Sequence, residues 1–75
     1  MDMAGREVIF EFRRLGGSVK VSAIDVATQV EIAVVMPAGA PEAAVRAQAL
    51  RRLGFVLDRK LRDRAPGDRA PGDQG

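Results

Sequence analysis

The sequence predicts an α+β fold of two layers, a three-stranded antiparallel β-meander with one C-terminal α-helix packed on one face. Two observations predict it. In the first half of the chain, apolar and polar residues alternate over three short stretches, as in strands with one buried face. From Pro41 to Arg62, apolar residues instead recur at steps of three and four, which places them on one face of a helix. The 75-residue chain therefore holds one domain, expected over residues 6–63.

The first expected strand turns Val8, Phe10 and Phe12 inward within the stretch Glu7 to Arg13. Gly16-Gly17 follows, and two glycines supply the positive φ angles of a tight hairpin. A turn around Leu15-Gly16 sets Glu11 opposite Lys20, whereas a turn around Gly16-Gly17 sets Arg13 opposite Lys20. Opposite charges across a strand pair stabilise by a few tenths of a kcal/mol and like charges cost about as much, so we favour the first register.

The second and third expected strands are separated by a turn at Asp25–Gln29, where Asp and Thr side chains can accept or donate bonds to nearby backbone groups. Pro37 ends the third strand, and Pro41 suits the first turn of a helix. The inward residues are Val19, Val21 and Ala23 on the second strand and Val30, Ile32 and Val34 on the third. The outward face carries Ile9, Ile24, Ala33 and Val35 among its polar residues.

The apolar arc of the expected helix is wide. It is centred near Leu50 and spans roughly 200°, against the ~100° that a surface helix usually needs. Gly54 lies within it, either to let the helix approach Phe10 or Phe12 closely, or to mark a kink or an early helix end. A helix of this length is ~31 Å long and a seven-residue strand ~23 Å, so one helix end should overhang the sheet. The arc is built from Ala43, Ala47, Leu50, Leu53, Leu57 and Leu61, widened by Val45, Ala49 and Val56.

Both ends of the chain differ from this pattern. Residues 1–5 show no periodicity and are expected to form a flexible N-terminus. Residues 64–75 contain the tandem repeat RAPGD-RAPGD, which has nothing to bury and is expected to be a disordered tail.

The composition argues against most enzyme chemistry. The chain has no Cys and no His, which removes disulfides, the usual zinc ligands and the nucleophile–base pairs that contain either residue. We therefore expect no enzyme activity, no cofactor and no metal. The apolar run at Ile32–Met36 is far shorter than the ~20 residues of a membrane span, and the N-terminus lacks the pattern of a signal peptide, so we expect a cytoplasmic protein without membrane contact.

The function that this sequence favours is self-association. A domain of ~60 residues buries only ~60% of its unfolded surface, and oligomerisation is the remaining common source of stability. We expect a homodimer that forms through the helix edge or the outer sheet face. The candidate contact residues are Val45, Ala49 and Val56 on the helix and Ile9, Ile24 and Val35 on the sheet.

Nucleic-acid binding is the alternative function. Residues 41–64 hold seven basic and three acidic side chains, whereas residues 6–36 hold four of each sign. Arginines at this density can contact phosphates, and Phe55 lies among them. Asp58 and Asp63 interrupt the basic face, which favours a solvated helix surface instead. The candidate contacts are Arg51, Arg52, Arg59 and Arg62.

The segments Glu7–Arg13, Ser18–Asp25 and Ala49–Leu57 carry a resemblance to a family of very short bacterial proteins of unknown function. The similarity extends from Arg6 to about Lys60. The resemblance implies a single domain, no established activity and no site residues. It also implies a glycine near position 29 and a polar cap near position 40, where this chain has Gln and Ala.

Overall fold

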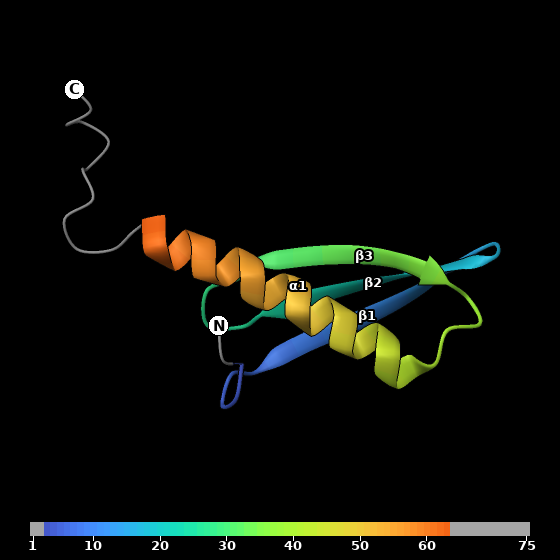
Figure 1. Ribbon diagram of the computed structural model, residues 1–75, viewed down its shortest axis with the longest axis horizontal. Helices are drawn as coiled ribbons and strands as arrows, with labels where there is room; N and C mark the ends of the chain where they lie inside the picture. The colour runs from blue at the N-terminus through green and yellow to red at the C-terminus, as the bar shows by residue number, and fades with distance from the viewer. Residues whose placement is uncertain (1–2, 64–75) are drawn as a thin grey trace, which may run out of the picture.

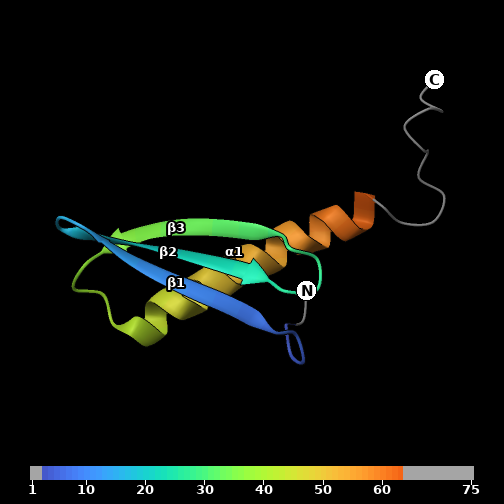
Figure 2. The same cartoon turned by 180° about the vertical axis from the view of Figure 1, so that it is seen from behind.

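The computed structural model describes residues 3–63 and has the predicted βββα architecture. Its elements are β1 (Val8–Leu15), β2 (Ser18–Asp25), β3 (Glu31–Pro37) and α1 (Glu42–Asp63). The strands form one antiparallel sheet in the order β1-β2-β3, and α1 lies diagonally across one face of it (Figures 1 and 2). The tandem repeat falls outside the described residues.

The register of the first hairpin differs from the one that we favoured. Arg13 lies opposite Lys20, and Leu15 and Ser18 close a two-residue loop. The two registers differ by two residues, so both turn the same side chains inward and the hydrophobic pattern cannot separate them. The turn decides instead: φ is +61° at Gly16 and is not positive at Gly17, the arrangement of a type II′ turn whose twist matches that of the strands. This preference outweighs the small cost of one exposed like-charge pair.

The turn between β2 and β3 is held by side chains, as predicted. The amide and the hydroxyl of Thr28 donate to Asp25 Oδ2 at 3.1 and 2.7 Å, and the Val30 amide donates to Thr28 Oγ1 at 3.2 Å. The Gln29 amide donates to the Asp25 carbonyl at 2.7 Å. Gln29 adopts a φ of +64°, a conformation that glycine reaches without strain.

The buried face of α1 is centred nearer Leu53 than Leu50, so the predicted centre is wrong by about 60° of helix rotation. Leu50 is half-buried and Leu61 is 42% exposed. The predicted centre of the buried face lies too near Leu50 because the pattern includes Ala43 and Ala47, and both of these residues are exposed. The fully buried apolar residues are Val21, Ala23, Val45, Ala49, Leu53 and Leu57.

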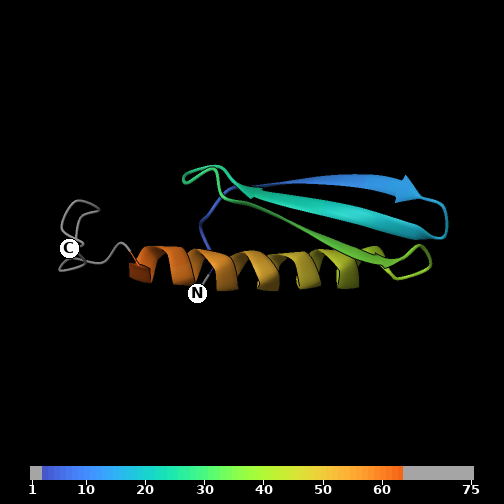
Figure 3. The same ribbon diagram turned by 90° about the horizontal axis from the view of Figure 1, so that it is seen from above.

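The helix covers the sheet unevenly. It packs chiefly against β2 and β3. Seen from above, β1 is the strand farthest from α1, and the C-terminal turns of the helix extend past the end of the sheet, which confirms the predicted overhang (Figure 3). The inner face of β1 is therefore the least covered part of the sheet.

Gly54 does not interrupt α1, which is continuous from Glu42 to Asp63, so the alternative of a kink or an early end is wrong. Gly54 is buried on the flank of the helix that faces the β1 side, where Met3 lines the same hollow. Met3 also packs against the core, although it belongs to the segment for which the sequence shows no pattern.

Candidate interaction surfaces

Strand β1 exposes an unusual amount of apolar side chain. Ile9, Leu15 and Phe12 are 52%, 47% and 40% exposed, and every residue from Glu11 to Leu15 is exposed to solvent. Phe12 faces inward as predicted, opposite Val21, but α1 covers it only in part. The sequence pattern identifies which face Phe12 occupies and says nothing about how far the helix extends over that face.

The outer edge of β1 also presents free backbone groups. The Val26 amide donates to the Glu7 carbonyl at 3.0 Å, so residue 7 and every second residue after it direct their backbone groups toward β2. The β1 amides and carbonyls that consequently point away from the sheet belong to Val8, Phe10, Phe12 and Arg14. Within the described chain, no strand pairs with this edge.

A cation lies over the two aromatic rings on the inner face of β1. The Arg46 guanidinium carbon lies 5.0 Å from the ring centroid of Phe10 and 5.3 Å from that of Phe12. The two ring centroids are 6.4 Å apart. Arg46 is in turn held by Glu42, whose Oε2 accepts from its Nε at 3.0 Å and its Nη2 at 2.9 Å. The first turns of α1 thus lie close to the exposed part of β1.

The solvent face of α1 brings two of the four predicted arginines together. Phe55 is 54% exposed, and the guanidinium carbons of Arg52 and Arg59 lie 5.8 and 5.9 Å from its ring centroid. Arg62 instead donates to Asp58 at 2.5 Å, and Arg51 donates to the Gln48 side chain at 3.2 Å. We call Arg52, Phe55 and Arg59 the arginine–phenylalanine cluster.

The predicted self-association residues fall into different environments. Val45 and Ala49 are buried against the sheet in the core of a single chain, and Val56 is half-buried. On the outer sheet face, Ile9 and Ile24 are direct cross-strand partners. Val35 is exposed and lies beside Lys20, further along the sheet toward the β1–β2 hairpin.

A partly buried ion pair near the second turn was not anticipated from the sequence. Asp25 is fully buried, and Arg6 Nε donates to its Oδ1 at 3.1 Å. The pKa of Asp25 lies below its ordinary value, mainly because the Thr28 hydroxyl donates to the carboxylate; the Thr28 amide and Arg6 act in the same direction, and burial opposes them. Arg6 precedes the first strand, where no periodic pattern signals a tertiary contact. The ion pair fastens the N-terminal segment to the sheet.

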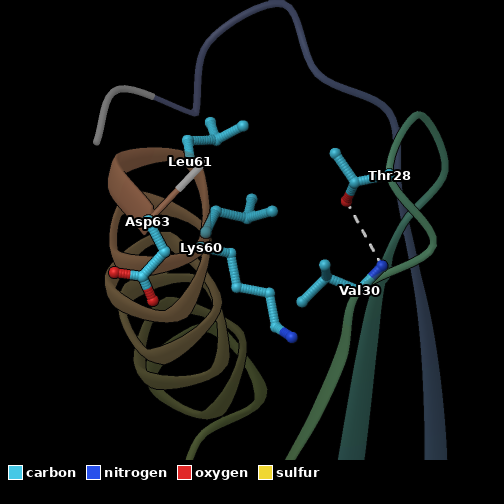
Figure 4. A pocket seen from close by; sticks show the side chains of 6 residues that line it. Thr28, Val30, Lys60, Leu61 and Asp63 are labelled. Carbon is cyan, nitrogen blue, oxygen red and sulfur yellow. Dashed lines mark hydrogen bonds between the residues drawn. The ribbon is translucent and has the colours of Figure 1, made fainter. Parts of the chain in front are cut away.

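A groove of about 340 Å³ lies between the second turn and the C-terminal part of α1 (Figure 4). Lys60 extends into the gap, and Thr28 and Val30 form the opposite wall. The Thr28 hydroxyl is already engaged with Asp25 and with the Val30 amide. Over residues 3–63 there is no group of three or more potential metal ligands and no helix long and apolar enough to span a membrane. The groove thus offers the Lys60 amine and the Asp63 carboxylate.

Comparison with known proteins places this architecture in a family. Residues 5–60 match the family model described as a domain of unknown function, DUF6898, which confirms the resemblance to a family without assigned activity. Comparisons with curated proteins and with solved structures found no match. Because the matched segment spans the sheet and nearly all of α1, the chain belongs to the DUF6898 family.

Proposed function

We propose that this chain is a non-enzymatic protein-interaction module that self-associates as a homodimer in the cytoplasm. The observation that carries the proposal is the apolar surface of the edge strand β1, where Ile9 and Leu15 on the outer face and Phe12 on the inner face are each at least 40% exposed. A small domain gains stability by covering such a surface. The lack of His and Cys supports a non-enzymatic role, and the lack of Cys agrees with a reducing compartment.

Self-association is tested by size-exclusion chromatography with light scattering over a range of protein concentrations. We expect a mass twice that of the chain at tens of micromolar and dissociation on dilution. Ile9→Ser should weaken the dimer, whereas Val26→Ser, at another exposed apolar site in the second turn, should leave it intact. A chain that is cooperatively folded and monomeric at tens of micromolar would refute the proposal.

Nucleic-acid binding is the second candidate, and the arginine–phenylalanine cluster favours it. An exposed ring flanked by Arg52 and Arg59 offers a stacking surface for a base beside two cations for phosphates. The geometry suits single-stranded RNA or DNA, whose bases are free to stack on an aromatic side chain.

Titration of labelled single-stranded oligonucleotides at several salt concentrations tests this candidate. The double variant Arg52→Gln/Arg59→Gln should weaken binding and reduce the salt slope by about two. The matched control Arg51→Gln/Arg62→Gln removes equal charge from arginines that are already engaged by Gln48 and Asp58. Equal losses in both variants would show diffuse electrostatic attraction, and no binding at low salt would eliminate the candidate.

A further inference from the structure

We propose that two copies of this chain pair antiparallel through β1, so that their sheets join into one continuous sheet with both helices on the same face. This inference rests on the self-association proposed above and specifies its surface, symmetry and register. The twofold axis passes beside Phe12. The partner is a second copy because β1 is complementary in charge to its own reverse.

Of the two free edges of the sheet, β1 is the one suited to pairing. It has eight residues, an unbroken set of outward-pointing amides and exposed apolar side chains. The other edge strand, β3, has seven residues and ends in Pro37. Proline lacks an amide hydrogen, so the end of this edge cannot donate a backbone hydrogen bond to another strand. A long uncovered edge such as β1 is a template for another strand.

Charge favours this register over those shifted by one residue in either direction. With Phe12 opposite Phe12 of the second copy, Glu11 lies opposite Arg13 and Ile9 opposite Leu15, each twice by symmetry. Centring the pair on Glu11 or on Arg13 instead sets like charges face to face. No turn connects the two copies, so the constraint that overrode charge in the first hairpin is absent here.

The backbone agrees with the same register. Val8, Phe10, Phe12 and Arg14 are the β1 residues whose amides and carbonyls point to the free edge, given the bond between Val26 and Glu7. In the proposed register these residues face one another: Phe12 pairs with its own counterpart and Phe10 with Arg14 of the second copy. On the inner face, Arg14 then lies beside the Phe10 ring of the second copy.

The flank of α1 supplies an independent observation. Ala43 and Ala47 are exposed and Leu50 is half-buried. These residues are the part of the wide apolar arc that the sheet of the same chain does not cover. These residues lie on the β1 side of the helix, the side on which Arg46 covers the β1 rings and Met3 lines a hollow with Ala47 and Leu50. A twofold axis beside Phe12 turns the two flanks toward each other, and alanines permit two helices to approach closely.

Cysteine crosslinking tests the pairing, because the chain contains no native cysteine. In the proposed register the Cα atoms of residue 12 lie ~5.5 Å apart, within the range of a disulfide. The Phe12→Cys chain should form a covalent dimer under mild oxidation at concentrations where the wild type is dimeric. Val35→Cys, on the opposite edge and exposed, is the matched control and should remain monomeric on denaturing gels.

Proline substitution gives a second test that keeps the hairpin intact. Arg14→Pro removes an amide that points to the free edge and none that bonds β2, so the fold should persist by circular dichroism while the dimer dissociation constant rises at least tenfold. Glu11→Arg should weaken the dimer in the same way, and Glu11→Arg/Arg13→Glu should restore it.

The outcomes separate the two proposals. A monomeric wild type refutes self-association and the pairing together. A wild-type dimer in which Val35→Cys crosslinks and Phe12→Cys does not, or which survives Arg14→Pro unchanged, refutes the β1 pairing and leaves self-association standing. If loss of the Phe12 ring unfolds the chain, the double variant Glu11→Cys/Arg13→Cys keeps the ring and must crosslink reciprocally, and its failure to do so equally refutes the pairing.

Discussion

Leu53 is fully buried at the centre of the helix face that packs against the sheet, so Leu53→Ala should be severely destabilising. The substitution removes three carbon atoms, which costs about 2.4 kcal/mol in lost hydrophobic transfer. A cavity remains because the neighbouring strand residues Val21 and Ala23 are fixed by the β-ladder. The expected total is about 3–5 kcal/mol, out of roughly 3–9 kcal/mol for a domain of this size.

Urea denaturation followed by far-ultraviolet circular dichroism measures this effect. The protein concentration is held fixed, because self-association would add to the apparent stability. Leu50→Ala, at a half-buried position, should cost about half as much, and Leu61→Ala, at the overhanging end, less than about 1 kcal/mol. If Leu50→Ala cost more than Leu53→Ala, the helix would be rotated toward the face that the hydrophobic periodicity indicates, and the packing described above would be wrong.

Three further predictions concern the turns. Gln29→Gly should stabilise the fold by about 0.5–1 kcal/mol, since φ is +64° at Gln29. Gly16→Ala should destabilise it by about 1 kcal/mol, since φ is +61° at Gly16. Thermal unfolding measures both effects, and a destabilised Gln29→Gly chain or a stabilised Gly16→Ala chain would contradict the strain argument. Asp25→Asn should destabilise the chain at neutral pH. The pKa of Asp25 is lower in the folded state, so its contribution is present above about pH 4 and is lost as the pH falls through the folded pKa. The difference in free energy of unfolding between the wild type and Asp25→Asn should therefore become smaller in acid. A difference that does not change with pH would exclude the ionised carboxylate as its cause.

The sequence specifies those parts of the fold that depend on local pattern. Alternation identifies the strands and their inward faces, Gly16-Gly17 marks the hairpin, and Asp25 and Thr28 mark the second turn. Each of these follows from residues that lie within a few positions of one another. The helix bounds also depend on local residues, and the predicted bounds, 41–62, agree with Glu42–Asp63 to within one residue at each end.

Features that depend on distant contacts were missed. The hairpin register differs by two residues from the favoured one, and periodicity is blind to such a shift. The helix rotation was wrong because Ala43 and Ala47 count as apolar in a pattern although burying a methyl group gains little. The ion pair between Arg6 and Asp25 joins residues nineteen positions apart, and no local signal marks Asp25 as buried.

The two proposed functions use different surfaces, and the β1 pairing connects them. The arginine–phenylalanine cluster lies on the solvent side of α1, so a dimer that forms through β1 leaves it accessible. The dimer then has two such clusters, one from each chain, on the same face of the joined sheet. Two linked sites bind a long strand more tightly than one, because the second contact becomes intramolecular. Arg14→Pro should therefore weaken binding to a long single-stranded oligonucleotide much more than to one that reaches a single cluster. Equal losses for both lengths would show that the two surfaces act independently.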